Sequence, residues 1–181
     1  GTCLLTPRYR LSDLDDSCWA SKDVVLWGDS HAAALASGLR AELTELTQVT
    51  YAACPPLMGY RSKTHPDCDD FNKLVMLRLK VEPPRTVFLH ANWVASAAAA
   101  DGTDVADALK DTLRFLDEIG VSEVHVVGGV PQFQPNLPTR FVREHDELRA
   151  GALVATRLEA VAAQDRLLKL AAGDSANFFF F

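Results

Sequence analysis

The stretch VVLWGDSHAAAL, residues 24–35, decides how the rest of the chain is interpreted. Its first four residues are apolar and lead into Gly28, a pattern typical of a buried parallel strand. The alanine-rich residues that follow favour a helix. Ser30 therefore lies at a tight strand-to-helix turn, which lifts its hydroxyl out of the sheet. The free N–H groups in the first turn of the helix can stabilise a developing negative charge there.

The same turn also has a purely structural interpretation. Gly28 permits the turn without a side-chain clash. Asp29 or Ser30 could cap the helix. The motif Gly-Asp-Ser alone leaves both interpretations open, so the remainder of the chain has to separate them.

Composition limits the class of protein. The chain has 181 residues, 48% of them hydrophobic, which suits one globular domain with a sizeable core. A formal net charge of −6 argues against nucleic acid or an anionic membrane surface as the main partner. No apolar run approaches the roughly 18 residues that span a bilayer, and the first ten residues do not resemble a signal peptide. We expect a soluble domain, and a piece cut from a longer protein fits these features.

The four cysteines indicate the compartment. None lies in a C-x-x-C motif, so a zinc site or a thioredoxin-like site is poorly supported. They pair naturally as Cys3–Cys18 and Cys54–Cys68, two loops of similar length, and each bond would stabilise the fold by about 3 kcal/mol. This pairing predicts an oxidising compartment, such as a bacterial periplasm or the cell exterior. Other pairings, or four buried free thiols in a cytosolic protein, remain open.

Strands and helices are predicted to alternate along the chain. Apolar runs predict five strands, at residues 23–27, 48–53, 86–90, 122–127 and 176–181. Helical periodicity predicts four helices, at residues 31–46, 70–81, 103–119 and 145–172. Residues 54–68, rich in proline and polar residues, form a loop enclosed by two cysteines, and residues 97–100 form a helical turn or a loop.

This alternation predicts an α/β fold with three layers, α/β/α, around a central, mostly parallel sheet. Residues 23–181 would form this domain, and residues 1–22 an N-terminal extension pinned by a disulfide. In such sheets a site lies at the carboxyl ends of the strands. Three candidate residues fall there: Ser30 after the first strand, Gly59 after the second and Asn92 after the third.

An ordered set of motifs carries a resemblance to a known family. Gly-Asp-Ser-His after an apolar strand resembles the first block of the SGNH hydrolase superfamily, named for a Ser, a Gly, an Asn and a His. The set GDSHAAAL, ACPPLMG, Cys68 with Asp70-Phe71-Asn72, and Asn92-Trp93 is similar to the periplasmic SGNH domain fused to acyltransferase family 3 membrane proteins. The resemblance implies an SGNH, flavodoxin-like fold. It also implies O-acetyltransferase activity on lipopolysaccharide, exopolysaccharide or peptidoglycan.

The resemblance also implies roles for individual residues. Ser30 matches the nucleophile, and its N–H, the N–H of Gly59 and the side-chain amide of Asn92 would form an oxyanion hole. His90 and Trp93 stand where the third block usually has Gly and Asp. These two could line an acceptor-sugar site or could simply pack. Gly59 could equally be a turn residue, and Asn92 could cap a turn.

A serine nucleophile needs a base, and the superfamily takes it from a C-terminal D-x-x-H motif. This sequence contains no D-x-x-H and ends in four phenylalanines, 178–181. The expectation is that the catalytic Asp and His lie beyond Phe181. Of the other histidines, we expect His31 to be a structural hydrogen-bonding residue and His125 to be packed in a strand. His145 is the one candidate for a rearranged base.

The first hypothesis is therefore an extracytoplasmic domain that moves an acetyl group to a bacterial glycan through an acyl-enzyme on Ser30. A fused or associated membrane domain would deliver the acyl group and tether the domain to the inner membrane. A stand-alone esterase or lipase is the second hypothesis, and a non-catalytic glycan-binding domain is the third. No residue set suggests a cofactor, a metal or a nucleotide site, because G-x-G-x-x-G and P-loop motifs do not occur.

Overall fold

The computed structural model describes residues 3–7, 9, 13–130, 138–139, 142, 158–173 and 178–180. Within these residues one sheet holds six strands in the order β1-β3-β2-β4-β5-β6, and every pairing is parallel. The strands are β1 (Leu4–Leu5), β2 (Val24–Gly28), β3 (Thr47–Tyr51), β4 (Thr86–His90), β5 (Glu123–Val127) and β6 (Phe178–Phe180). The predicted α/β fold with a parallel sheet is confirmed.

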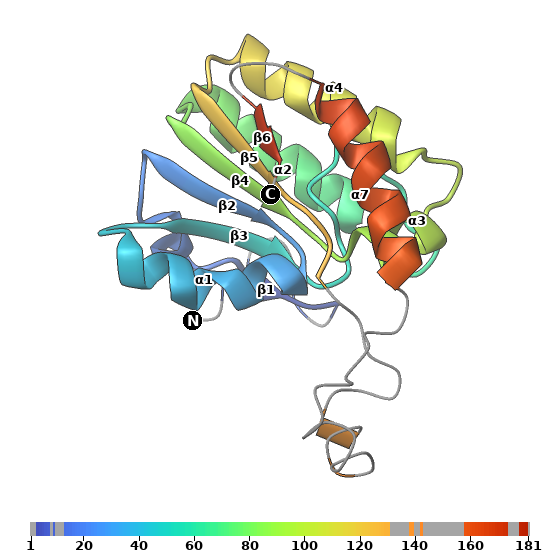
Figure 1. The fold of residues 1–181 in the computed structure, drawn as a ribbon. Helices are drawn as coiled ribbons and strands as arrows, with labels where there is room; N and C mark the ends of the chain where they lie inside the picture. The colour runs from blue at the N-terminus through green and yellow to red at the C-terminus, as the bar shows by residue number, and fades with distance from the viewer. Residues whose placement is uncertain are drawn as a thin grey trace.

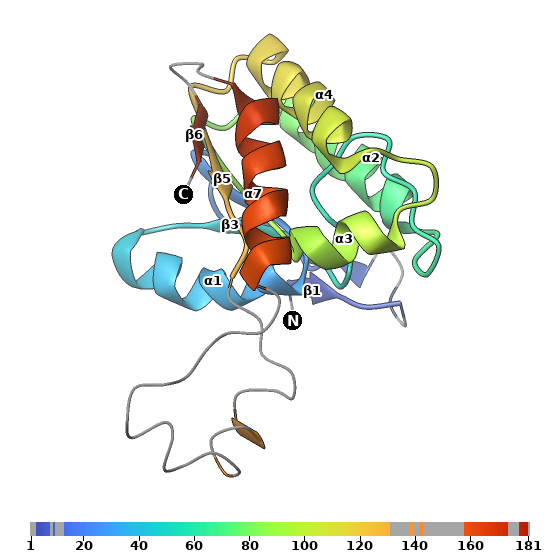
Figure 2. The same cartoon turned by 45° about the vertical axis from the view of Figure 1, so that its right-hand side comes forward.

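Helices cover both faces of the sheet (Figure 1). The helices are η2 (Asp16–Trp19), α1 (Ser30–Glu42), α2 (Cys68–Val81), α3 (Trp93–Ala99), α4 (Val105–Glu118) and α7 (Leu158–Ala172). Helix α1 packs on one face through Ala32 and Ala36 against Leu26. Helices α2, α4 and α7 pack on the other face, where most of the core lies. Helix α7 lies beside α4 and α3 in both views (Figure 2).

Most predicted elements lie within a few residues of their observed bounds, but β1 and η2 were not predicted and α3 was predicted only in part. Leu4–Leu5 pair in parallel with β3, and Leu5 is buried, although the sequence predicts only an extension there. Two apolar residues are too few to show a strand period. For helix α3 the sequence predicted only a helical turn or a loop at residues 97–100, because seven alanine-rich residues carry little amphipathic pattern. Residues 145–157 of the last predicted helix lie outside the described residues.

The predicted disulfide pairing is confirmed. Cys3 is bonded to Cys18, and Cys54 is bonded to Cys68. The first bond fixes β1 beside the 3₁₀ helix η2, and the second closes the loop between β3 and α2. Within the part of the chain that the structure describes, no helix is long and apolar enough to cross a membrane.

Gly28 is required by a close backbone approach at the end of β2. A Cβ atom there would lie 1.8 Å from the carbonyl oxygen of His90 and 2.7 Å from Cβ of Ala32. The neighbouring strand β4 and helix α1 therefore both approach the chain where it turns toward Ser30. The absence of a side chain at Gly28 sets how closely the carboxyl ends of β2 and β4 lie.

We predict that Gly28→Ala lowers the free energy of unfolding by about 3 kcal/mol or more, because backbone atoms cannot move aside as a flexible side chain can. Gly38→Ala is the matched control. Gly38 lies in α1 with no atom near its missing Cβ, so this change should raise stability by about 0.5–1 kcal/mol. Urea denaturation of both variants measures the difference, and equal effects would contradict the steric argument.

Candidate active site

The carboxyl ends of β2, β3 and β4 meet at one edge of the sheet, because these strands are neighbours in the order β3-β2-β4. The loops that follow them, together with α3, surround one pocket of about 260 Å³. Its lining residues are Asp29, Ser30, His31, Ala53, Thr64, Asn92, Ala95, Ser96 and Ala99. The structure thus brings two of the three candidate residues, Ser30 and Asn92, to the same pocket.

The carboxylate of Asp29 connects two of these loops. One oxygen, Oδ1, accepts a hydrogen bond from the N–H of His31 at 2.7 Å and caps helix α1. The other, Oδ2, accepts from the N–H of Asn92 at 2.9 Å. The side chain is buried, with 2% of its surface exposed. Asp29 therefore fixes the start of the Ser30 helix relative to the loop after β4.

Ser30 is the first residue of α1 and is exposed. Of the two possible caps, Asp29 takes the role, so the hydroxyl of Ser30 is not needed to cap the helix. The N–H groups at the start of a helix carry partial positive charge and point outward from its first turn. The position of Ser30 is compatible with attack on a carbonyl carbon whose oxygen develops negative charge.

Asn92 combines two roles that the sequence left as alternatives. It is the N-cap of α3, where its Oδ1 accepts from the N–H of Ala95 at 3.2 Å. It also lines the pocket beside Ser30. Because Oδ1 serves as the cap, the amide orientation is fixed, and its Nδ2 group is the donor end of the side chain.

Gly59 is not brought to this pocket, and this corrects the expectation that it lies beside Ser30. It is exposed and has φ of 67°, a left-handed conformation that fits its alternative interpretation as a turn residue. Ala53, two residues beyond β3, lines the pocket in its place. Ala53 has φ of 55°, which is uncommon for a residue with a side chain. The sequence did not indicate Ala53 as a site residue, because alanine gives no sequence signal for a positive φ.

His90 and Trp93 are buried, each with 1% of its surface exposed, so the interpretation that they line a sugar site is not supported. Both side chains point instead toward β5. The carbonyl oxygen of Val127 accepts from Trp93 Nε1 at 2.7 Å and lies 3.0 Å from His90 Nδ1. Since a carbonyl can only accept, this contact places a proton on Nδ1. These two hydrogen bonds hold the end of β4 beside the end of β5.

The remaining histidines occupy different surroundings. His31 lines the pocket, and the centroid of its ring lies 6.0 Å from that of His90. His125 is packed as predicted, with its ring stacked on Phe88 at 4.7 Å. The candidate base His145 lies outside the described residues.

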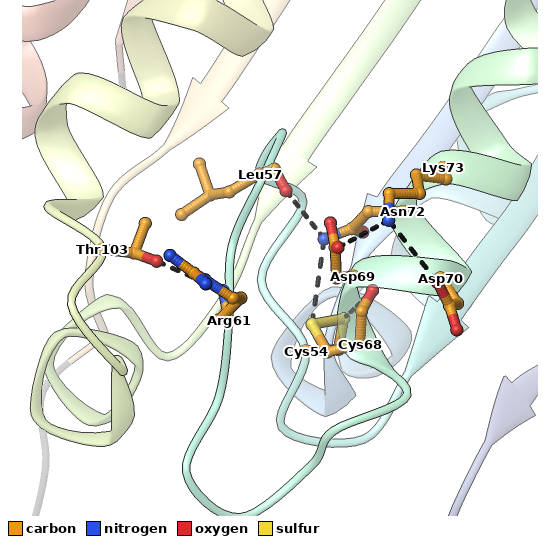
Figure 3. Close-up of polar contacts among 9 residues, drawn as sticks. All are labelled: Cys54, Leu57, Arg61, Cys68, Asp69, Asp70, Asn72, Lys73 and Thr103. Carbon is orange, nitrogen blue, oxygen red and sulfur yellow. Dashed lines mark hydrogen bonds and ion pairs between the residues drawn. A yellow bond between two sulfur atoms is a disulfide. The ribbon is translucent and has the colours of Figure 1, made fainter.

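The loop between Cys54 and Cys68 is held on one side by Asn72 of α2 (Figure 3). The buried amide of Asn72 donates to the carbonyl oxygens of Pro55 at 2.9 Å and Leu57 at 2.8 Å. Its oxygen accepts from Trp27 Nε1 at 3.1 Å. Trp27 belongs to β2, three residues before Ser30. One buried side chain therefore links the strand that leads to Ser30 with the loop that follows Ala53.

The other side of this loop is held by α3 and by Thr103, which lies between α3 and α4. The hydroxyl of Tyr60 donates to the carbonyl oxygen of Ser96 at 2.8 Å, and the N–H of Lys63 donates to that of Ala99 at 3.0 Å. Arg61 donates through its N–H to Oγ1 of Thr103 at 3.2 Å (Figure 3). The loop thus forms a fixed wall of the pocket, with Thr64 facing it.

Comparison with known proteins identifies the family to which this chain belongs. Residues 2–179 match the model of the SGNH domain (fused to AT3 domains). The chain belongs to this family. The SGNH domain is also similar to the periplasmic domain of a lipopolysaccharide acetyltransferase from Salmonella ser. Paratyphi A. The TM-score is 0.69 at 21% sequence identity, with 92% of this chain and 68% of the Salmonella chain covered, which shows a shared fold. No curated protein matches this SGNH domain in sequence.

We predict that Asp29→Ala destabilises the SGNH domain by about 2–4 kcal/mol, because two backbone N–H groups in different loops lose their acceptor. Asp104→Ala is the control, since Asp104 also accepts two N–H groups but at an exposed helix start. That change should cost about 1 kcal/mol. Chemical denaturation compares them, and an Asp29→Ala cost no larger than the control would disprove the linking role.

A second prediction concerns the pH dependence of stability. Burial lowers the pKa of His90 from its ordinary value of 6.5, so the folded domain holds this ring neutral. The unfolded chain binds a proton as pH falls through 6.5, and the folded domain binds it only at lower pH. This contribution to stability is therefore complete above pH 6.5 and is lost as the pH falls below it.

The measurement is the free energy of unfolding between pH 7.5 and 5 for the wild type and His90→Gln. Glutamine keeps an N–H donor for Val127 but does not titrate. We expect a smaller fall in stability at acidic pH for the variant. An unchanged pH dependence would show that His90 does not carry it.

Proposed function

We propose that this SGNH domain transfers an acetyl group to a bacterial surface glycan, with Ser30 as the nucleophile. The observation that carries the proposal is the shared pocket of Ser30 and Asn92, in a family described as fused to AT3 domains. The similarity of fold to a lipopolysaccharide acetyltransferase domain supports a glycan acceptor. The acceptor class is lipopolysaccharide, exopolysaccharide or peptidoglycan.

The proposed reaction proceeds in two acyl transfers. Oγ of Ser30 attacks the carbonyl carbon of the acyl donor and loses its proton, and the donor's leaving group departs with a proton. The acyl-serine ester is then attacked by a glycan hydroxyl, which gives the glycan ester and restores Ser30. Both steps pass through an oxyanion, which the Ser30 N–H, the Ala53 N–H and Nδ2 of Asn92 would stabilise. Ala53 takes the role that Gly59 was expected to have.

The proposed partner is a membrane acyltransferase domain that delivers the acyl group, as the description of the family suggests. The same description and the periplasmic neighbour support a periplasmic or other extracytoplasmic location, tethered through that partner. Two disulfides support an oxidising compartment independently of the family.

A non-catalytic glycan-binding domain is the alternative, and one observation favours it. The sequence contains no D-x-x-H, so the usual source of a general base for Ser30 is missing from it. A stand-alone esterase differs from the first proposal only in its acceptor, which would be water. An acyl-serine intermediate separates the catalytic proposals from the binding domain.

We predict that p-nitrophenyl acetate acetylates Ser30 in a chain extended past Phe181, where the catalytic Asp and His are expected, and adds one acetyl group to the intact mass. Ser30→Ala should abolish this adduct. Ser37→Ala, an exposed serine two turns further along α1, should retain it. Peptide mass spectrometry locates the adduct. An adduct that persists in Ser30→Ala, or that is absent from the wild type, would favour the binding-domain alternative.

Asn92 is tested with a pair of variants that separate capping from stabilisation of the oxyanion. Asn92→Asp keeps an oxygen to cap α3 but lacks the amide donor, whereas Asn92→Ala loses both. We expect either change to slow formation of the acyl-serine by about 10²–10³. Stability should fall mainly in Asn92→Ala. Normal acylation in Asn92→Asp would exclude the amide from the oxyanion hole.

A further inference from the structure

The pocket extends from Ser30 to the inner face of α3, where its wall is made of small side chains. Ala95 and Ala99 are one helical turn apart and both line the pocket. Ala97 and Ala98 of the same helix do not line it. The side chains at positions 95 and 99 therefore decide how much of the roughly 260 Å³ is open.

This wall is fixed in place, so the pocket cannot enlarge by moving the helix away. The backbone carbonyls of Ser96 and Ala99 accept hydrogen bonds from Tyr60 and Lys63, which belong to the disulfide-closed loop. Ser62 and Ala100 form an antiparallel bridge at the end of the same helix. Tyr60 is fully buried and Ser96 is 4% exposed. The size of the pocket is thus set by side chains and not by helix position.

The chemistry of the lining along α3 suits the apolar chain of an acyl group. The lining surface of the pocket is mainly apolar, and Ala95 and Ala99 present methyl groups to it. Ser30 and Asn92 supply polar groups for an ester carbonyl, and Asp29, His31, Thr64 and Ser96 complete the polar part of the lining. An ester has the same division, with a polar carbonyl and an apolar chain.

We propose that Ala95 and Ala99 form an acyl-binding subsite and that Ala99 limits the length of the acyl chain. This inference rests on the proposed function, since it gives the acyl group of that reaction its place. With the carbonyl at Ser30 and Asn92, the chain extends toward α3. Larger side chains introduced at these positions of α3 should leave room for an acetyl group and exclude longer acyl chains.

The test measures binding without catalysis, so it does not depend on turnover. Ser30→Ala protein, labelled with ¹⁵N, is titrated with 4-nitroacetanilide and 4-nitrohexananilide, amides that resist transfer. Amide resonances of residues 30, 92, 95 and 99 report occupancy of the pocket. Adding Ala99→Leu should weaken binding of the hexanoyl amide at least about ten-fold, because the methylene groups that are excluded from the pocket lose their burial. Binding of the acetyl amide should change less than about three-fold.

Ala98→Leu in the same background is the control, because it adds the same side chain to the exposed face of α3. It should leave binding of both amides unchanged. Ala99→Val is the second variant, with a smaller effect expected from its smaller side chain, and the amide spectra show whether each variant is folded. The proposal is overturned if neither amide shifts these resonances. It is also overturned if Ala99→Leu and Ala99→Val discriminate between the amides no more than Ala98→Leu does.

The two proposals can fail separately. Absence of an acetyl adduct on Ser30 removes the proposed reaction, whatever the amides do. Acylation of Ser30 together with chain-length-independent binding would leave the reaction standing and remove only the subsite on α3.

Discussion

The two hydrogen bonds of the Asp29 carboxylate are the constraint on which the site depends. Parallel strands bring Ser30 and Asn92 to one edge of the sheet, but strand pairing alone does not fix two loops to each other. Asp29 does so by accepting one N–H from each, and its burial protects both bonds from competition by water. A buried charge is normally costly, and here two donors compensate it. The acidic residue of the Gly-Asp-Ser motif is thus a positioning residue.

The contacts that position the site also belong to the buried core. Gly28 allows β4 to approach, His90 and Trp93 connect that strand to Val127, and Asn72 connects Trp27 to the loop beyond Ala53. None of these side chains needs to touch a substrate to influence the pocket. Together these contacts hold the loops and helices around the pocket in fixed positions. Donor groups in fixed positions can stabilise a developing charge without rearranging.

Sequence patterns predicted the structural features that depend on burial of apolar residues and on spacing along the chain. Apolar runs located the main strands, and nearby cysteine spacing gave both disulfides. The patterns failed where tertiary contacts override local preference. Leu4–Leu5 form a strand only because β3 offers an edge, and Ala53 adopts a positive φ that alanine disfavours in isolation. Gly59 was predicted to lie at the site because it is a glycine after the second strand, but its positive φ belongs to a turn on the exposed side of the loop.

Within the part of the chain that the structure describes, the residues that line the pocket all fall between Asp29 and Ala99. The described elements that follow support this stretch, chiefly through Val127, and none of their described residues lines the pocket. The described lining of the pocket is therefore one exchangeable segment of sequence. A chimera of two relatives that crosses over between α3 and α4 would carry the substrate preference of its N-terminal parent, provided that the β5 of the other parent accepts the same two hydrogen bonds.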